Sequence, residues 1–276
     1  MNITVFGMGI IGSRCADNWQ HSGASVTRWN RTPKEIPGFV RDAATAAQAS
    51  DVLSFFLKDS KALRDVFEQI RPVLTDRHFL MNHSTVDLTT TLWLAEQCKA
   101  IGCGFVDSPF TGSKVAAGEG KLMYYLAGAD DAIARAETIL PPTASAMIRM
   151  GEMGHATVVK LSTNLIAACQ IQALSEAMAL CLKHGISKES FAHAITQHGT
   201  ASALTKMKLP GMLEGDFDTH FSLDNMRKDS VYALELAHAL HLSLPAMQTV
   251  SQRMSDLCTS GLADQDYTAL AKPYQV

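Results

Sequence analysis

Residues 3–12 read Ile3-Thr4-Val5-Phe6-Gly7-Met8-Gly9-Ile10-Ile11-Gly12, a short apolar run followed by a Gly-x-Gly-x-x-Gly turn. The run is typical of a β-strand, and the pattern from Ile11 to His21 predicts that a helix follows the turn. In that context the glycines permit a tight turn and close approach of the backbone to a pyrophosphate, whose charge the helix N-terminus attracts. The pattern indicates a dinucleotide site; the alternative is an ordinary glycine-rich turn.

The first half of the chain continues to alternate strands with helices. Further strands are expected at residues 25–29, 52–57, 79–81, 104–106 and 123–127. Alternation of this kind predicts an α/β domain with a doubly wound, parallel Rossmann sheet. The run over 52–57 is apolar almost throughout, as expected for a strand that is buried on both faces.

The character of the sequence changes near residue 154. A helical pattern extends over about 155–184, and shorter helical patterns cover 188–197, 223–240 and 246–260. Strand signals nearly vanish in this half. The sequence therefore predicts a Rossmann domain over 1–154 and an all-α domain over 155–276, joined by the long helix.

Composition narrows the classes of partner. The 276 residues carry 24 basic and 27 acidic side chains, so no basic excess exists to neutralise a nucleic acid. The six cysteines form no Cys-x-x-Cys pair, and neither a metal site nor a disulfide framework is predicted. The apolar run over 165–182 is interrupted by Gln, Ser and Glu, which favours a buried helix over a membrane span. With no targeting pattern at Met1–Thr4, we expect a cytoplasmic protein.

The second expected strand ends in Asn30, Arg31 and Thr32. Sites that prefer NAD usually place Asp or Glu at this point, because a carboxylate accepts hydrogen bonds from the adenosine ribose. A guanidinium matches the geometry of a phosphate instead, so these residues favour the 2′-phosphate of NADP. The alternative is a surface arginine in a loop.

Two further segments carry polar residues where chemistry could occur. The loop after the strand at 104–106 contains Thr111, Gly112 and Ser113, whose backbone N–H groups suit a carboxylate, although the same composition is common in ordinary loops. On the long helix, Lys160 and Asn164 lie four residues apart and share one face. Burial would lower the pKa of Lys160 and suit it to proton transfer. The alternative is a lysine whose stem packs while its ammonium reaches water.

Taken together, these segments resemble the β-hydroxyacid dehydrogenase family, which includes the 3-hydroxyisobutyrate dehydrogenases and the glyoxylate/succinic semialdehyde reductases. The resemblance covers nearly the whole chain and rests on four motifs in the family's order. They are the glycine-rich turn, an Asp-x-Pro-x-Ser-Gly-like loop at 107–122, a Gly-x-x-Gly helix start at 151–164, and Lys228-Asp229. On the residues alone, Lys228 and Asp229 would be interpreted as a solvated charged face. The resemblance is strongest to the glyoxylate/succinic semialdehyde reductase branch.

Residue by residue, the resemblance places the family's catalytic lysine at Lys160 and its partner asparagine at Asn164. The substrate-carboxylate loop falls on Thr111, Gly112 and Ser113, and Thr111 stands where serine is usual, so its added methyl narrows the pocket. Thr111 is the third implied catalytic residue, and Phe221 and Asp229 are implied at the substrate cleft. The implied cofactor contacts are Gly7, Met8, Gly9, Ile10, Ile11, Gly12, Asn30, Arg31, Thr32, Leu57, Lys58, Asp59, Ser84, Thr85 and Lys228.

The resemblance implies hydride transfer between NADP(H) and a small β-hydroxyacid or aldehyde acid, such as glyoxylate, succinic semialdehyde or 3-hydroxyisobutyrate. Lys160 is the implied general acid and base. Relatives associate through the helical domain, so a homodimer or homotetramer is expected. Three alternatives stay open. They are an imine reductase, in which Asp or Tyr usually replaces Lys160; a 6-phosphogluconate dehydrogenase, which usually has a longer helical region; and a non-catalytic NADP-binding interaction protein.

Overall fold

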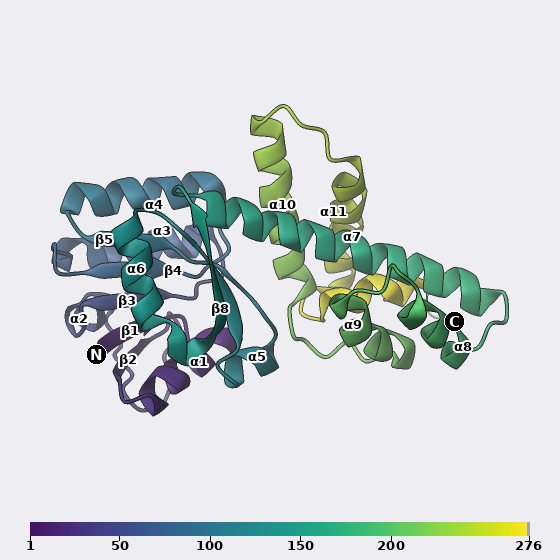
Figure 1. Ribbon diagram of the computed structural model, residues 1–276, viewed down its shortest axis with the longest axis horizontal. Helices are drawn as coiled ribbons and strands as arrows, with labels where there is room; N and C mark the ends of the chain where they lie inside the picture. The colour runs from purple at the N-terminus through teal and green to yellow at the C-terminus, as the bar shows by residue number, and fades with distance from the viewer. Residues whose placement is uncertain (275–276) are drawn as a thin grey trace. The chain divides into compact units, whose positions relative to one another are not determined.

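The computed structural model describes residues 1–274. The chain divides into two compact units, Met1–Lys160 and Leu161–Val276 (Figure 1). The N-terminal unit is a Rossmann-like sheet covered by helices, and the second unit is all-helical, so the predicted fold class is confirmed. Each unit encloses hydrophobic core of its own.

The sheet of the N-terminal unit contains β1 (Asn2–Phe6), β2 (Ser25–Trp29), β3 (Val52–Phe55), β4 (Phe79–Asn82), β5 (Gly104–Asp107), β6 (Phe110–Thr111), β7 (Leu122–Ala127) and β8 (Ala144–Gly151). The strand order is β2-β1-β3-β4-β5-β7-β6, and β8 pairs with β7. β1 to β5 run parallel, and Phe6 lies between Trp29 and Phe55. The order reverses between β1 and β3, and open α/β sheets bind ligands at the C-terminal ends of the strands at such a point.

The far edge of the sheet differs from the prediction. β7 runs antiparallel to β5 and β6, so the sheet is mixed and not wholly parallel. The sequence does not predict β6 or β8. β6 has two residues, and none of the eight residues of β8 is buried. Neither strand therefore has the continuous apolar run that marks a strand buried on both faces.

Helices cover both faces of the sheet (Figure 1). α1 (Ile10–His21) and α6 (Asp130–Ile139) pack on the face to which Ile3 and Val5 point. Phe6 points to the other face, which is covered by α2 (Ala43–Gln48), α3 (Ser60–Ile70) and α4 (Leu88–Ile101). Alternate side chains of β1 thus belong to different cores, as the pleat of a strand requires. Shorter helical segments are α5 (Lys114–Gly118), η1 (Arg71–Val73) and η2 (Pro141–Thr143).

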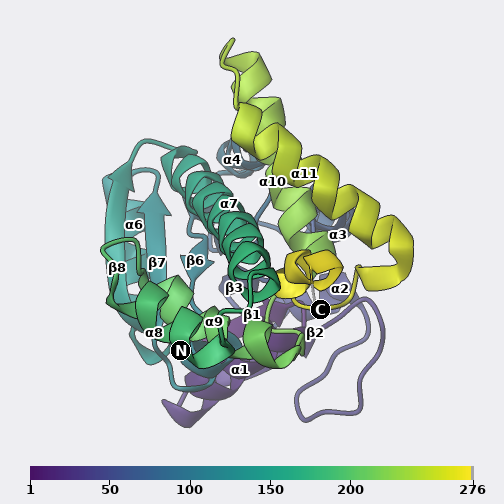
Figure 2. The same cartoon turned by 90° about the vertical axis from the view of Figure 1, so that its right-hand side faces the viewer.

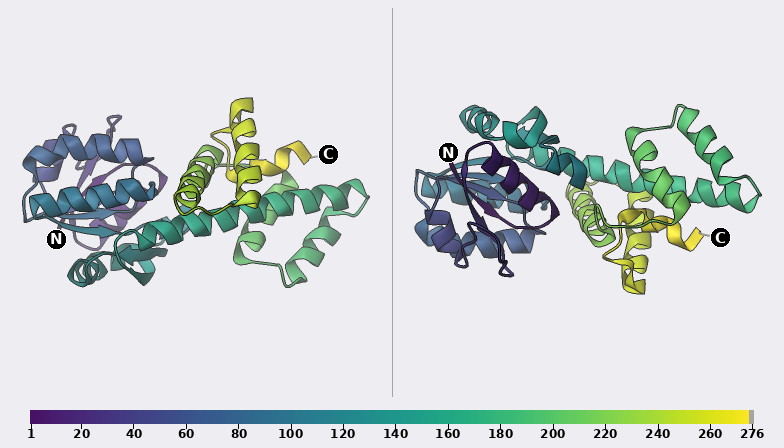
Figure 3. Two further views of the ribbon diagram at one scale, coloured as in Figure 1. Left: turned by 90° about the horizontal axis from the view of Figure 1, so that it is seen from above. Right: turned by 90° about the horizontal axis from the view of Figure 1, so that it is seen from below.

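The helical unit contains most of α7 (His155–Lys183), followed by α8 (Lys188–Gln197), α9 (Ala203–Glu214), α10 (Leu223–Ala239), α11 (Pro245–Leu257), a π-helical turn η3 (Cys258–Leu262) and a 3₁₀ segment η4 (Tyr267–Tyr274). α10 and α11 lie side by side (Figure 2). The C-terminal segment, yellow in Figure 3, contacts α9, α10 and α11. The sequence does not predict α9, because Pro210 lies inside it and interrupts the helical pattern.

By length and apolar composition alone, α7 is a helix that could cross a membrane. Core helices of globular proteins share both features, so they do not by themselves indicate a membrane. Of the 18 most apolar consecutive residues of α7, only 33% are buried, which is fewer than we expect for a buried helix. Ile166 and Leu180 are 61% and 75% exposed.

Candidate active site

The glycine-rich turn follows β1, and each of its three positions holds glycine for a different reason. Gly7 has a φ of +104°, and a Cβ there would lie 2.2 Å from the carbonyl oxygen of Phe56. A Cβ on Gly12 would lie 2.0 Å from the carbonyl oxygen of Gly7, so glycine lets α1 pack directly on the turn. At Gly9, no atom of the described residues beyond its immediate neighbours lies within 4 Å of a Cβ. The fold itself requires Gly7 and Gly12, whereas the space at Gly9 fits the close approach of a bound group.

The N-terminus of α1 is suited to an anion. Gly9 is its N-cap, and no side chain within residues 1–274 caps this end. The first turn of α1 contains no acidic residue. The first N–H groups of a helix lack intrahelical partners, and together with the helix dipole they attract negative charge. The turn and the helix end therefore fit the pyrophosphate of a dinucleotide.

Gly9→Ala is expected to raise the dissociation constant of NADPH by about tenfold or more and to leave thermal stability unchanged. The backbone φ of −80° suits alanine, and the added methyl meets open space. Gly12→Ala is the matched change, because the same methyl collides with the Gly7 carbonyl and should lower the melting temperature. Tryptophan fluorescence measures both quantities. An unchanged dissociation constant for Gly9→Ala would contradict this assignment.

The residues that follow β2 form hydrogen bonds with the glycine-rich turn. The Met8 N–H donates to Asn30 Oδ1 at 3.0 Å, and Asn30 Nδ2 donates to the Thr32 carbonyl at 2.9 Å. Arg31 lies between these two residues and is exposed. Lys34, which was not among the predicted cofactor residues, donates to the Met8 carbonyl oxygen at 2.6 Å. Its position three residues after Arg31 is the signal that could have identified it.

The ends of β3 and β4 carry the next predicted cofactor residues. The Leu57 N–H donates to Ser84 Oγ at 2.8 Å, and Ser84 Oγ donates to the Phe55 carbonyl at 3.3 Å. The two loops are thereby joined, and Lys58 and Thr85 are the residues that follow Leu57 and Ser84. The Asp59 carboxylate accepts a hydrogen bond at 2.7 Å from the backbone N–H of the residue three positions later, and thereby caps the N-terminus of α3. This cap is a structural role that the resemblance did not imply.

Asp107 ends β5 and anchors the beginning of α7. Its carboxylate accepts from the Thr157 N–H at 2.9 Å and from the Thr157 hydroxyl at 2.9 Å, and the Thr157 hydroxyl lies 2.9 Å from that of Thr91. Asp107 is fully buried, and this burial raises its pKa to about 7 although the hydrogen bonds from Thr157 act in the opposite direction. Because Lys160 follows Thr157 by three residues, Asp107 fixes the helical turn that carries Lys160.

The loop predicted to bind a substrate carboxylate is fixed by strand pairing at its beginning and by a helix cap at its end. Phe110 and Thr111 form β6 and pair with β7. Gly112 has a φ of +141°, and a Cβ there would lie 2.7 Å from the Leu122 side chain. The hydroxyl of Ser113 accepts from a backbone N–H of α5 at 3.2 Å and caps that helix. This cap is a structural role of Ser113 that the loop motif did not predict.

In the helical unit, Asn164, Lys228 and Asp229 form one cluster. Asn164 Nδ2 donates to Asp229 Oδ2 at 2.6 Å, and Lys228 Nζ donates to Asp229 Oδ1 at 2.6 Å. Asp229 is only 1% exposed. The interpretation of Lys228 and Asp229 as a solvated face is therefore wrong for Asp229, because α10 turns this carboxylate inward, where charge-assisted hydrogen bonds replace water.

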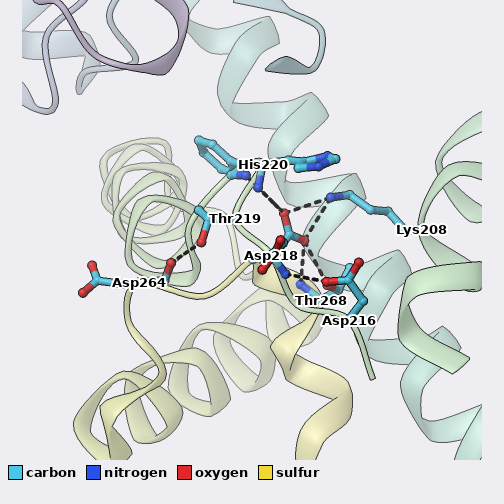
Figure 4. A network of polar contacts seen from close by, with 9 residues as sticks. Lys208, Asp216, Asp218, Thr219, His220, Asp264 and Thr268 are labelled. Atoms are coloured by element: carbon cyan, nitrogen blue, oxygen red, sulfur yellow. Dashed lines mark hydrogen bonds and ion pairs between the residues drawn. The ribbon is translucent and has the colours of Figure 1, made fainter. Parts of the chain in front are cut away.

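Phe221 precedes α10 in a segment that is ordered by the buried carboxylate of Asp266. This carboxylate accepts from Lys208 Nζ at 2.9 Å and from the backbone N–H groups of His220 and Phe221 at 3.1 Å (Figure 4). The next residue, Ser222, caps α10. The Asp266 network therefore sets the beginning of the helix that carries Lys228 and Asp229. No sequence pattern marks Lys208 and Asp266, because their pairing joins residues 58 positions apart.

The structure thus brings the predicted residues into two groups. The cofactor residues of the N-terminal unit follow β1, β2, β3 and β4, and hydrogen bonds join neighbouring loops. Asn164, Lys228 and Asp229 form the second group in the helical unit. Lys160 and Asn164 keep their four-residue spacing, because α7 is one uninterrupted helix. No three His, Cys, Asp or Glu side chains within residues 1–274 are arranged to hold a metal ion.

Known proteins resemble the whole chain. A family model described as the NAD binding domain of 6-phosphogluconate dehydrogenase matches residues 2–154, and one described as NAD-binding of NADP-dependent 3-hydroxyisobutyrate dehydrogenase matches residues 154–274. Glyoxylate/succinic semialdehyde reductase 2 of Arabidopsis thaliana, a chloroplastic protein, is 27% identical over 98% of this chain and 78% of its own length. The cytokine-like nuclear factor N-PAC of Homo sapiens is 24% identical over 99% of this chain, which spans 51% of that protein.

Among solved structures, 3-hydroxyisobutyrate dehydrogenase of Mycobacterium tuberculosis with L-serine superposes with a TM-score of 0.90 at 21% identity. The match covers 100% of this chain and 99% of that one. The first family model alone covers more than half of the chain, and the second continues where it ends. The chain therefore belongs to the β-hydroxyacid dehydrogenase family, as an NAD(P)-binding oxidoreductase of the 3-hydroxyisobutyrate dehydrogenase and semialdehyde reductase group.

Proposed function

We propose that this protein is an NADPH-dependent reductase of small aldehyde acids, of the glyoxylate or succinic semialdehyde type, with Lys160 as the proton donor. The observation that carries the proposal is the anchoring of α7 by Asp107. The same residue leads into the 110–113 loop, so the turn before Lys160 and the loop share one fixed point at the C-terminal end of β5. Acid catalysis depends on such positioning. The likeness to the Arabidopsis reductase supports the substrate class.

The proposed roles follow from the chemistry of each group. The glycine-rich turn would hold the pyrophosphate of a dinucleotide, whose nicotinamide would supply the hydride. The Lys160 ammonium gives its proton to the substrate oxygen on which negative charge develops, and in the oxidative direction the neutral amine takes it back. Backbone N–H groups of Thr111, Gly112 and Ser113 hold the substrate carboxylate. The amide nitrogen of Asn164 donates to Asp229, so Asp229 sets the orientation of the Asn164 amide within the helical unit.

Arg31 is the proposed contact for the 2′-phosphate, so wild-type protein should bind NADPH far more tightly than NADH. Arg31→Ala is expected to raise the dissociation constant of NADPH by about tenfold or more and to leave that of NADH nearly unchanged. Lys34 remains as a second cation beside the turn, so some preference should survive. Arg71→Ala removes an exposed arginine elsewhere in the same unit and serves as the control. Equal losses of affinity for both cofactors in Arg31→Ala would contradict this role.

A substrate panel tests the function directly. NADPH consumption would be measured with glyoxylate, succinic semialdehyde, tartronate semialdehyde and methylmalonate semialdehyde, with a cyclic imine beside them. We expect at least one aldehyde acid to reach a kcat/KM of about 10⁴ M⁻¹s⁻¹ or more, and no turnover of the imine. Turnover of the imine alone would assign an imine reductase instead.

A non-catalytic NADP-binding protein is the second candidate, and the likeness to N-PAC favours it, because that relative is described as a nuclear factor. The same panel separates the two. Tight NADPH binding without turnover of any aldehyde acid would support the second candidate. The anchored α7 and the pairing of Phe110 and Thr111 with β7 favour the enzyme, since an interaction protein has no need of a positioned lysine.

We propose further that the protein forms a homo-oligomer through α7. Six residues at alternating spacings of four and three along this helix are exposed or half-buried: Ser162, Ile166, Cys169, Ala173, Glu176 and Leu180. A stripe with this spacing is typical of a seam between helices. Size-exclusion chromatography with light scattering should give a dimer or tetramer, and Ile166→Glu should shift it toward smaller species. A wild-type mass near that of one chain, 29.9 kDa, would contradict the proposal.

A further inference from the structure

An aromatic cluster connects several loops of the N-terminal unit. Phe56 stacks on the His83 imidazole with ring centroids 4.6 Å apart, and Tyr124 meets His83 edge-on at 5.3 Å. Phe110 packs against Phe56 at 5.9 Å and against Tyr124 at 6.1 Å. Phe56 follows β3, His83 follows β4, and Phe110 and Tyr124 pair across β6 and β7. The cluster thus joins the predicted cofactor loops to the predicted substrate loop.

His83 is the fixed centre of this cluster. Its side chain is buried, and Nδ1 lies 2.8 Å from the carbonyl oxygen of Ser108, two residues before Phe110. Nε2 has no hydrogen-bond partner within residues 1–274. Burial lowers the pKa of His83 to about 4, so the ring is neutral at physiological pH and packs as an aromatic. His83 therefore packs as a buried, neutral ring between Phe56 and Tyr124.

Phe110 presents its ring to Lys160. The Lys160 Nζ lies 5.9 Å from the centroid of the Phe110 ring. A cation within about 6 Å of an aromatic face is attracted by the ring quadrupole. The backbone of Phe110 is fixed by pairing with Tyr124, and its ring is fixed by Phe56 and Tyr124, so the surface that meets the ammonium is preformed.

We propose that Phe110 is a positioning residue, whose ring holds the Lys160 ammonium at the edge of the aromatic cluster beside the 110–113 loop. Asp107 fixes the backbone turn before Lys160, and Phe110 fixes the far end of the side chain. The contact stands on the geometry of the N-terminal unit alone. Its effect on turnover rests on the function proposed above.

Three variants separate the ring's electrostatics from its bulk. Phe110→Leu keeps an apolar side chain but removes the π face, whereas Phe110→Tyr keeps that face. Phe67→Leu is the matched control, because Phe67 is a buried ring that packs on Trp93 in the core on the other face of the sheet. It removes a ring that is more deeply buried than Phe110, so it is a stringent control for lost packing, and it leaves the surroundings of Lys160 intact.

The kinetic test uses the most active aldehyde acid of the panel at saturating NADPH. We expect Phe110→Leu to lower kcat roughly 3- to 30-fold with an unchanged dissociation constant for NADPH. Phe110→Tyr should restore most of the turnover, and Phe67→Leu should behave as wild type. A kcat for Phe110→Leu within about twofold of wild type would overturn the proposal.

A second test requires no turnover. Lysines labelled by reductive ¹³C-methylation keep their charge, and a Lys160→Arg sample identifies the Lys160 resonance by its loss. Ring current from Phe110 should shift that resonance upfield in wild type and in Phe110→Tyr, and the shift should vanish in Phe110→Leu but not in Phe67→Leu. An unshifted wild-type resonance would overturn the contact itself. If no aldehyde acid were a substrate while the ring-current shift was present, the contact would stand and the proposed function would fail.

Discussion

Lys160→Ala is expected to lower turnover of the most active aldehyde acid by about 10²–10⁴-fold and to leave the dissociation constant of NADPH within about twofold of wild type. Alanine removes the only group that we assign to proton donation, while the glycine-rich turn and the β2 end keep their hydrogen bonds. The loss should therefore fall on kcat. Rapid-mixing kinetics and fluorescence titration of NADPH measure the two quantities separately.

Two further lysine variants sharpen this result. Lys160→Arg keeps the positive charge but should also lose most of the turnover, because a guanidinium does not release its proton in the working pH range. Lys183→Ala removes a lysine from the last turn of the same helix and should behave as wild type. A Lys160→Ala enzyme within a few-fold of wild type would reject Lys160 as the proton donor.

The stability of the N-terminal unit is expected to fall as the pH rises from about 5 to 8, through the titration of Asp107. Burial raises the pKa of Asp107 in the folded state from 3.8 to about 7. Between these two values the folded chain holds a proton that the unfolded chain releases, so this stabilisation is complete below about pH 4 and is lost as the pH passes 7. The whole shift corresponds to about 4 kcal/mol, of which about 3 kcal/mol falls between pH 5 and pH 8.

Asp107→Asn is the control for this effect, because an amide of the same shape stays neutral at every pH. All three tryptophans, Trp19, Trp29 and Trp93, lie in the N-terminal unit, so urea unfolding followed by tryptophan fluorescence reports on that unit. The free energy of unfolding of wild type minus that of Asp107→Asn should decrease by about 3 kcal/mol from pH 5 to pH 8. Parallel pH profiles for the two proteins would show that Asp107 does not titrate in this range.

The features of the fold that the sequence predicts are those with a strong local pattern. Strands β1, β3 and β4 are short apolar runs, and each is buried on both faces. β6 and β8 lack such a run, and the direction of β7 depends on a loop that no periodicity encodes. α9 contains Pro210, which is ordinarily a helix breaker. Local pattern therefore predicts the two-domain organisation but not the mixed edge of the sheet.

For the candidate site, too, the sequence predicts some residues, whereas their contacts become visible only in the structure. The glycine-rich turn, Arg31 and Lys160 are visible in the sequence, because each carries a motif or a clear chemical type. The bonds from Asp107 to Thr157 and from Asn164 to Asp229 join residues 50 and 65 positions apart, and no spacing rule predicts them. The Phe110 ring beneath Lys160 is a contact of the same kind, 50 positions apart along the chain. The sequence indicates the groups that we propose to react, and the tertiary structure supplies the groups that hold them.

The role of Lys160 as proton donor can be examined in a crystal structure with NADP⁺ and the hydroxyacid product of the most active substrate. We expect Lys160 Nζ to lie about 3 Å from the hydroxyl oxygen of the product, within reach of a hydrogen bond. A Lys160 side chain turned to bulk solvent, with its Nζ more than about 10 Å from that oxygen, would contradict it.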